Sequence, residues 1–404
     1  MRFEFSTAGR IVFGRGVVRE CGPLAAAFGK RAFVVGGRDA SRADALLESL
    51  AAAGLTWERL ACSGEPTFDD VRAATSLARA SGCDLVIGIG GGSAMDTAKA
   101  VSALLTNGGD PLDYAEVIGG GRPLDRPALP CIAIPTTAGT GSEVTRNAVL
   151  SSSEHKAKAS LRSPSMIPRI ALVDPELCLG LGREATATTG MDALTQLIEP
   201  FVSNRANPFT DSLCREGIER VARSLERACR SLGDLDARED MSLASLFGGA
   251  ALANARLGAV HGFAAPLGGA YPVPHGAACA ALLAPATAAN VRALRSRDPG
   301  SPALARYAEI ARTLRGGRAS SPEDAAPALA ELAAELGIRG LASYGLFPED
   351  MPGLTAKAKT TSSMQGNPIG LTDEELISIL VAASGTLFAP SAPAILLGDE
   401  PSRT

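Results

Sequence analysis

Residues 84–100 read DLVIGIGGGSAMDTAKA. An apolar run at 84–89 leads into three glycines and Ser93, and a helical pattern follows. Glycines at such a turn let backbone amides approach an anion, and the first turn of a helix carries partial positive charge. The stretch therefore predicts a buried strand, a tight turn and a helix that binds a diphosphate, with Gly91, Gly92 and Ser93 as candidate ligands. The alternative is a plain turn in which Ser93 caps the helix.

The same order of strand, turn and helix recurs along the first 180 or so residues. AFVV at 32–35 precedes two glycines and a helix-like segment at 41–53, CIAI at 131–134 precedes a polar loop, and ALVD at 171–174 resembles a last strand. Repeated strand–turn–helix units are typical of a parallel sheet with helices on both faces. We therefore predict an α/β N-terminal domain of the Rossmann-like kind.

A second small-residue loop, PTTAGTGSE at 135–143, follows the strand at 131–134. The hydroxyl groups of Thr136, Thr137 and Thr140 could donate to phosphate or ribose oxygens, although such a loop could equally be a flexible turn. Two such loops at the carboxyl ends of parallel strands predict one nucleotide-binding crevice. Lys158 is a further candidate, from its position, to approach a cofactor phosphate or the nicotinamide.

The end of the strand at 32–35 bears on the kind of dinucleotide. An acidic residue there would bind the 2′-hydroxyl group of NAD, whereas glycine with a nearby arginine leaves room for the 2′-phosphate of NADP. Gly37 precedes Arg38, and Arg42 follows one turn later. This favours NADP or the use of both cofactors, while Asp39 keeps NAD open.

Composition narrows the class of protein. The 404 residues carry 39 Lys+Arg and 43 Asp+Glu, a formal net charge of −4, and aromatic residues make up 4%. A mildly acidic chain without a basic block argues against nucleic acid and anionic membranes as partners, and scarce aromatics argue against base stacking. Eight cysteines without a CxxC pair predict reduced, mostly buried thiols. Residues 1–16 alternate in polarity, unlike a signal peptide; we predict a β-hairpin there and a cytoplasmic protein.

The composition of the chain and the spacing of its apolar residues change after Arg183. Alanine-, leucine- and arginine-rich segments with apolar residues three and four apart dominate, which predicts an all-helical second half. The length also favours two domains. We predict an α/β domain at 1–182, a helical domain at 183–404, and a proline-rich tail at 390–404.

Residues 257–291 contain no Asp, Glu, Lys or Arg. Four prolines at 266, 272, 274 and 285 argue against one membrane-spanning helix, so we predict buried irregular structure around a site. His261 and His275 lie in this stretch, whereas His155 lies in a polar segment and is expected to be a solvated loop residue.

Asp192 and Gln196 are four residues apart at the start of a predicted helix, so both side chains lie on one face and could reach one ion. Each histidine alone could be a core residue. Together with a helical carboxylate, His261 and His275 predict a divalent-metal site. A metal with an open position would act as a Lewis acid on a hydroxyl or carbonyl oxygen.

These motifs together resemble the iron-containing (group III) alcohol dehydrogenase family, which includes lactaldehyde/propanediol oxidoreductases and maleylacetate reductases. The resemblance covers nearly the whole chain. Its motifs, in order, are GGGSAMDTAK (90–99), IPTTAGTGSEVT (134–145), LVDPEL (172–177), GMDAL (190–194), the segment around His261 and His275, and GNPIGLTDEEL (366–376).

The resemblance implies an NAD(P)-binding α/β domain, a helical domain that holds one divalent metal, Fe(II) or Zn(II), and hydride transfer between them, in an architecture shared with dehydroquinate synthase. The glycine loop matches Gly91, Gly92 and Ser93, and the threonine loop matches Thr136, Thr137 and Thr140. The metal aspartate falls on Asp192 and two metal histidines on His261 and His275. A small alcohol or aldehyde as substrate and a homodimer are implied as well.

Two positions depart from the family pattern. A metal histidine is usual where this chain has Gln196, and a second histidine, often assigned to proton relay, is usual where it has Ala265. An amide oxygen is a harder and weaker ligand than imidazole, so loose Fe(II) binding, another metal or no tightly held metal are all open. A proton would have to leave through water, the ribose hydroxyls or another group.

The expected function is a metal-dependent, NAD(P)-linked alcohol dehydrogenase or aldehyde reductase in which Asp192, His261 and His275 are catalytic. The alternatives are a maleylacetate-type keto-acid reductase that does not need metal, a dehydroquinate synthase-like lyase, and a non-catalytic nucleotide-binding protein.

Overall fold

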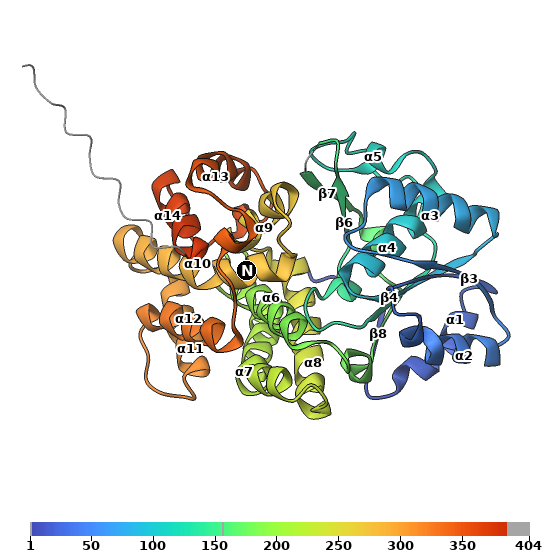
Figure 1. Cartoon of the computed structure of the whole chain (residues 1–404), viewed down its shortest axis with the longest axis horizontal. Helices are drawn as coiled ribbons and strands as arrows, with labels where there is room; N and C mark the ends of the chain where they lie inside the picture. Colours follow the sequence, from blue (N-terminus) through green and yellow to red (C-terminus); the bar gives the residue numbers. More distant parts are fainter. Residues whose placement is uncertain (1, 156, 386–404) are drawn as a thin grey trace, which may run out of the picture.

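The computed structural model describes residues 2–155 and 157–385. A parallel sheet with its helices occupies one side of the molecule, and a bundle of helices occupies the other (Figure 1). The predicted combination of an α/β part followed by an all-α part is therefore confirmed.

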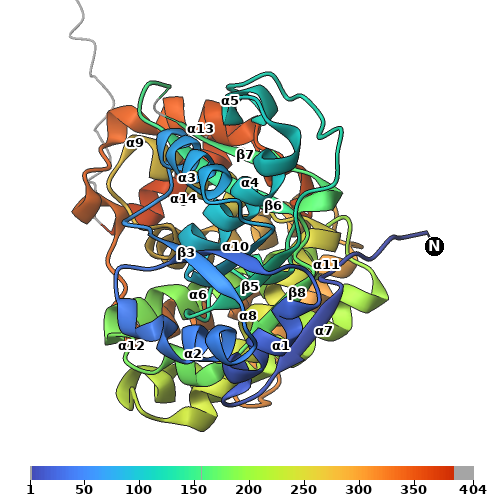
Figure 2. The same ribbon diagram turned by 90° about the vertical axis from the view of Figure 1, so that its right-hand side faces the viewer.

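The main sheet has six strands, all parallel, in the order β1-β8-β5-β4-β2-β3. All six residues of β4 are buried, as expected of a central strand covered on both faces. Helices α1 and α2 pack against one face, and α3 and α4 against the other (Figure 2). The strands of this sheet are β1 (Arg10–Phe13), β2 (Arg31–Gly36), β3 (Thr56–Ala61), β4 (Leu85–Gly90), β5 (Cys131–Pro135) and β8 (Ile170–Val173). The helices of this part are α1 (Cys21–Ala26), α2 (Asp44–Ala52), α3 (Phe68–Ala80), α4 (Gly92–Asn107) and the short α5 (Pro111–Tyr114).

The predicted N-terminal hairpin is wrong. Within residues 2–16 only β1 forms, and it pairs in parallel with β8 at the edge of the sheet, with Arg10 opposite Ile170. Alternating polarity identifies a strand but not its partner, and the partner here lies 160 residues away. An antiparallel hairpin does occur later in the chain, where β6 (Asn147–Ser152) pairs with β7 (Ala157–Arg162).

The second half of the chain is helical, as predicted, and one large apolar core joins most of its helices. The helices are α6 (Arg183–Val202), α7 (Pro208–Arg230), α8 (Leu235–Ala255), α9 (Ala259–Ala270), α10 (His275–Arg297), α11 (Pro302–Leu314), α12 (Ala325–Leu336), α13 (Met351–Lys359) and α14 (Asp373–Ser384). The predicted division at 182/183 coincides with the start of α6, and the domain boundaries as such stay a prediction. The predicted tail at 390–404 lies outside the described residues.

The predicted irregular structure at 257–291 is also wrong, because the segment forms α9 and most of α10. Pro272 and Pro274 fall in the break between the two helices, whereas Pro266 and Pro285 are tolerated inside them. A proline inside a helix costs one backbone hydrogen bond, and the surrounding core compensates for that loss. Within the described residues, α10 is long and apolar enough to cross a membrane, but 72% of its most apolar window is buried inside the protein, as for a core helix.

Candidate active site

The glycine loop after β4 and the threonine loop after β5 contact each other. A Cβ atom on Gly92 would lie 3.1 Å from Cγ2 of Thr140, and one on Gly91 would lie 3.6 Å from Cγ2 of Thr137. The backbone amide of Thr136 donates to the carbonyl oxygen of Gly90 at 2.9 Å. The register of β4 with β5 therefore brings the two predicted loops to one edge of the sheet.

Helix α4 begins without a side-chain cap. Its N-cap residue is Gly91, and Ser93 lies inside the first turn, where its carbonyl oxygen accepts a hydrogen bond from Oγ1 of Thr97 at 2.9 Å. Ser93 is thus not the N-cap that a plain structural turn would need. The first backbone amides of a helix have no partner within the helix, so those at Gly92 and Ser93 suit an anion.

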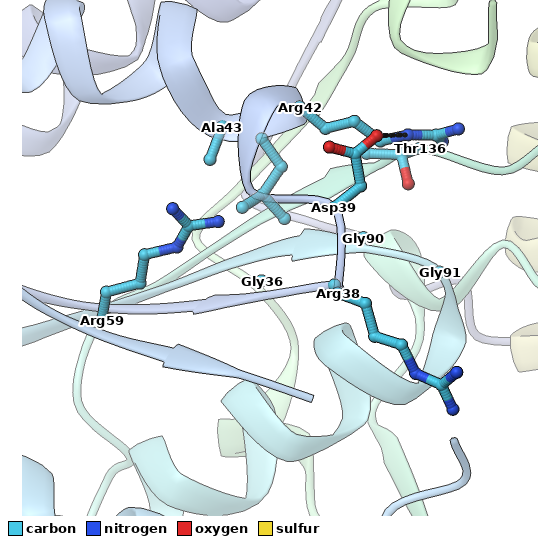
Figure 3. A pocket seen from close by; sticks show the side chains of 11 residues that line it. Gly36, Arg38, Asp39, Arg42, Ala43, Arg59, Gly90, Gly91 and Thr136 are labelled. Atoms are coloured by element: carbon cyan, nitrogen blue, oxygen red, sulfur yellow. Dashed lines mark ion pairs between the residues drawn. The ribbon is translucent and has the colours of Figure 1, made fainter. Parts of the chain in front are cut away.

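A pocket of about 190 Å³ lies beside these loops and is lined by Gly37, Arg38, Gly91 and Thr136, all of which the sequence singles out. Its remaining lining residues are Gly36, Asp39, Arg42, Ala43, Arg59, Ile89 and Gly90. Figure 3 shows Arg42 beside the Asp39 carboxylate, Arg59 on the other side of the pocket, and Arg38 pointing away from both. The carboxyl end of β2 thus forms one wall of the pocket.

Asp39 is engaged in local contacts within this pocket. Its Oδ1 atom accepts hydrogen bonds from the backbone amide and the hydroxyl of Ser41 at 3.1 and 2.6 Å, and its Oδ2 lies 3.5 Å from Nε of Arg42. These hydrogen bonds, helped by the charge of Arg42, lower the pKa of Asp39. The carboxylate is therefore occupied as the cap of the 3-10 turn Ala40–Ala43.

Arg59 is a pocket residue that the sequence does not identify. It lies on β3, which pairs with β2 at the edge of the sheet, and its Nη2 atom donates to the carbonyl oxygen of Ala40 at 3.1 Å. Strand order is a tertiary property, so only the folded sheet places Arg59 beside the end of β2.

Lys158 lies apart from this pocket. Its Nζ atom is 2.5 Å from Oε1 of Glu65, and a side chain at Gly268 of α9 would collide with that ammonium group. The side chain is 7% exposed and lies where β7 meets the helical part. A role of Lys158 toward the cofactor stays a prediction.

A cluster of possible metal ligands lies in the helical part. One donor atom each from Asp192, His261, His275 and Cys279 lies within 4.8 Å of all the others. The Oδ1 atom of Asp192 is 3.4 Å from Nε2 of His261 and 3.6 Å from Nε2 of His275. Three helices, α6, α9 and α10, therefore bring their predicted ligand residues to one point.

Gln196 lies one turn after Asp192 on α6, and both side chains are 2% exposed. The Oδ1 atom of Asp192 and the Oε1 atom of Gln196 are buried without a hydrogen-bond partner. A buried polar oxygen without a partner is costly, and a cation among the donor atoms of Asp192, His261 and His275 would satisfy the Oδ1 atom of Asp192. The residues present therefore fit a metal ion.

The break between α9 and α10 positions the two histidines. His261 is the third residue of α9 and His275 is the first of α10, and their ring centroids are 5.4 Å apart. His261 is 7% exposed, whereas the His275 side chain is 37% exposed and reaches solvent. His155, by contrast, is an exposed residue of the β6–β7 turn, as predicted.

Glu199 is a site residue that the sequence analysis missed. Its Oε2 atom lies 2.7 Å from Nδ1 of His261, and its Oε1 atom accepts from the backbone amide of Val260 at 2.7 Å. A carboxylate on the outer nitrogen of a metal-binding histidine fixes the ring and raises its basicity. The spacing in the sequence could have identified Glu199, because residues 192, 196 and 199 share one helix face.

Asn367, in the predicted GNPIG motif, supports the same region. Its Oδ1 atom accepts from the backbone amide of Ala259 at 3.1 Å, and its Nδ2 atom donates to Oδ1 of Asn290 at 2.7 Å. The motif thereby holds the first turn of α9, which carries His261.

The electrostatics of the cluster favour positive charge. Burial alone would lower the pKa of His261, but Cys279, Asp192 and Glu199 outweigh it and raise this pKa well above its ordinary value. Burial alone would raise the pKa of Asp192, but the charges of His275 and His261 lower it. Such a site stabilises a cation.

The cluster lies next to the nucleotide loops. A side chain at Gly139 in the threonine loop would collide with Thr189, which is one turn before Asp192 on α6. A side chain at Gly276 would collide with the backbone of Thr188. The first half of α6 therefore packs directly against both the threonine loop and the start of α10.

Comparison with known proteins supports the assignment of the chain to the iron-containing alcohol dehydrogenase family. The family model described as iron-containing alcohol dehydrogenase matches residues 8–175, and the C-terminal model of the Fe-containing alcohol dehydrogenase family matches residues 186–384. The probable alcohol dehydrogenase EutG of Escherichia coli is 37% identical over 386 residues, which cover 94% of both chains.

Solved structures agree. A 1,3-propanediol oxidoreductase matches with a TM-score of 0.87 and 32% identity, covering 95% of this chain and 100% of the other. Sulfoacetaldehyde reductase from Bifidobacterium kashiwanohense, solved with NAD⁺, matches with a TM-score of 0.83 and 29% identity, covering 96% and 100%. Together with the donor cluster, the family supports NAD(P) and one divalent metal as cofactors. The chain belongs to the iron-containing alcohol dehydrogenase family and is an NAD(P)-linked oxidoreductase that acts on the CH–OH group of alcohols or on the corresponding aldehydes.

Proposed function

We propose that Asp192, His261 and His275 hold the metal, with Gln196 as a weak further ligand, and that they form the catalytic centre for reversible oxidation of a small alcohol. The observation that carries this proposal is the donor cluster with its unpartnered Asp192 oxygen, one turn along α6 from the contact between Thr189 and the threonine loop. Fe(II) or Zn(II) suits two imidazoles and a carboxylate. When bound, the ion supplies a Lewis acid to the substrate oxygen, and the nicotinamide supplies C4 as hydride acceptor or donor.

The chain's own residues orient the reactants. The backbone amides of Gly92 and Ser93 bind the diphosphate, for which Gly91 leaves space, and the hydroxyls of the threonine loop bind phosphate or ribose oxygens. Glu199 keeps the Nδ1 proton of His261 and so turns Nε2 toward the site. Ala265 offers no group that takes a proton, so the alcohol proton leaves through water or the ribose hydroxyls.

We further propose NADP as the preferred cofactor. A Cβ atom on Gly37 would meet nothing within 4 Å, so space exists beside the end of β2. Arg38, Arg42 and Arg59 line the same pocket, and Asp39 is already engaged with Ser41. Arginine near an open strand end suits the 2′-phosphate.

A substrate panel with NADH and NADPH, with Fe(II), Zn(II), Mn(II) or no metal added, tests these assignments. We expect metal-dependent, NADPH-preferring reduction of short aldehydes, and loss of both turnover and bound metal in His275→Ala. Full activity of metal-stripped His275→Ala would overturn the metal assignment. The comparisons give no support to a maleylacetate-type reductase or a dehydroquinate synthase-like lyase; reduction of maleylacetate that is insensitive to chelator would favour the former.

We also propose that the protein is a cytoplasmic homodimer. Phe3 and Phe209 are 47% and 57% exposed, and the ring of Phe5 packs at a tilt against that of Phe209 with a centroid distance of 4.9 Å, next to the segment that enters the edge strand β1. Exposed aromatic groups of this kind mark interaction surfaces. Light scattering of the wild type and of Phe209→Ser tests the dimer, because the substitution should weaken it. The eight free cysteines suit a reducing compartment.

A further inference from the structure

We propose that the thiolate of Cys279 is a ligand of the divalent metal, in place of the imidazole that the family pattern puts at Gln196, and that it shifts the metal preference of this chain toward Zn(II). The inference rests on the proposed metal site and adds to it a ligand of different chemistry.

The distances between the donor atoms are the first observation that supports Cys279 as a ligand. Sγ of Cys279 lies 3.8 Å from Nε2 of His261 and 3.7 Å from Nε2 of His275. A tetrahedral ion holds nitrogen and oxygen at about 2.0–2.2 Å and sulfur at about 2.3 Å, which puts such donors roughly 3.3–3.6 Å from one another. The observed separations, together with 3.4 and 3.6 Å from Asp192 to the two histidines, are close to the edges of that tetrahedron.

Cys279 could instead be a neutral thiol that packs against the histidines. That arrangement would leave Oδ1 of Asp192 buried, 2% exposed and without a hydrogen-bond partner. A thiol is a weak donor at these distances, so it contributes little to either imidazole. A cation among the four atoms satisfies the Asp192 oxygen and both Nε2 atoms at once, and it makes the thiolate the favoured form of Cys279.

The chemical types of the ligands support the preference for Zn(II). Gln196 offers an amide oxygen in place of the imidazole, which weakens binding of Fe(II), whereas a thiolate is a soft ligand that favours Zn(II). Binding releases the thiol proton to solvent, and no electron is transferred. One carboxylate and one thiolate balance the two charges of the ion. A zinc ion held by Asp192, His261, His275 and Cys279 would still accept the substrate oxygen, because catalytic zinc sites can expand to five ligands.

Cys279 lies one helical turn after His275 in the sequence HGAAC, so both side chains lie on one face of α10. The helix therefore presents a histidine and a cysteine to the site, just as α6 presents Asp192 and Gln196. Each helix contributes a pair of possible ligands four residues apart.

X-ray absorption at the zinc edge and Co(II) substitution test the inference on the full chain. With one equivalent of Zn(II), the wild type should show one sulfur neighbour at about 2.3 Å. With Co(II), it should show a thiolate-to-cobalt charge-transfer band in the near ultraviolet. Cys279→Ala should lose both signals and bind Zn(II) at least about 10-fold more weakly, by the scale of ligand-sphere substitutions. Cys178→Ala, which removes another buried thiol, 3.8 Å from Ser242 Oγ, should keep both signals.

A metal environment of nitrogen and oxygen only in the wild type would overturn the inference, as would a thiolate band that survives Cys279→Ala. If Cys279→Ala does not fold, the sulfur count of the wild-type zinc spectrum decides alone. Metal-dependent turnover with a sulfur-free site would refute only the role of Cys279. Full turnover of a protein that binds no metal would refute the proposed metal site as well.

Discussion

Oε2 of Glu199 lies 2.7 Å from Nδ1 of His261, while Nε2 of the same ring lies 3.4 Å from Oδ1 of Asp192. One imidazole therefore connects two carboxylates on α6 that are seven residues apart. The outer carboxylate orients the ring, and the inner one shares the metal site with it.

Replacing Glu199 with glutamine should weaken metal binding by about 10- to 100-fold, because the amide no longer fixes the tautomer of His261 as a carboxylate does. The measurement is chelator competition for Zn(II), and thermal unfolding should show that the variant folds. Glu184→Gln, on the same helix but paired with Arg339 at the surface, is the control and should bind metal as the wild type does. Unchanged affinity in Glu199→Gln would contradict the positioning role.

Gln196→His should increase retention of Fe(II), because imidazole is a better ligand for it than an amide oxygen. We expect loss of Fe(II) to a chelator to slow by at least about 10-fold, the scale of a 1.4 kcal/mol gain. Gln365→His, at a position that contacts Arg256, adds a histidine elsewhere and should leave the rate unchanged. Equal rates in Gln196→His and the wild type would show that position 196 does not face the ion.

Gly37→Asp should exchange the cofactor preference. A carboxylate beside the end of β2 binds the ribose 2′-hydroxyl and repels a 2′-phosphate, so NADPH binding should weaken relative to NADH by at least about 10-fold. Titration of the fluorescence of the bound reduced cofactor measures both affinities. Gly182→Asp, at another open glycine, is the control. A wild type that already prefers NADH would contradict the NADP proposal.

Glu143, in the threonine loop, should make stability depend on pH. Burial raises the pKa of this carboxyl group from 4.5 to about 7, and its Oε2 atom has no hydrogen-bond partner. The folded state favours the protonated form of Glu143. The contribution of this group to the free energy of unfolding is therefore fully present below about pH 4.5 and is lost as the pH rises through 7. The loss is about 3 kcal/mol at 1.36 kcal/mol per pKa unit.

Denaturant titrations from pH 5 to pH 8 measure this dependence. Glu143→Gln should be more stable than the wild type at pH 8 and should lose most of the slope, whereas Glu20→Gln, at an exposed position, should follow the wild-type profile. Parallel profiles for Glu143→Gln and the wild type would refute the assignment.

Asn367→Ala should destabilise the protein by about 1–3 kcal/mol, because the buried amide of Ala259 and the side chain of Asn290 lose their partner. Chemical unfolding measures the change. Asn147→Ala, which removes the acceptor of an exposed hydrogen bond from Arg162, should change stability by less than about 0.5 kcal/mol. A wild-type midpoint for Asn367→Ala would show that α9 does not depend on this contact.

The class of fold follows from residue patterns that are local in the sequence. The strand–glycine–helix pattern at 84–100 and its repeats along the first 180 or so residues predicted a parallel α/β part, because parallel strands need helical crossovers between them. Helical spacing after Arg183 fixed the second part. The motifs also fixed Asp192, His261 and His275 as candidates, since residue type and helical spacing are local properties.

Contacts between residues that are distant in the sequence depend on how the elements pack. The pairing of β1 with β8, the position of Arg59 beside the end of β2, and the contact of Glu199 with His261 depend on strand order and helix packing. Pro266 and Pro285 are tolerated inside α9 and α10 because the packed core around them compensates for a lost backbone hydrogen bond, which no local pattern reveals. In the sequence, Cys279 is a single cysteine without a motif. It lies at the candidate metal site because the break between α9 and α10 brings His261 next to the first turn of α10.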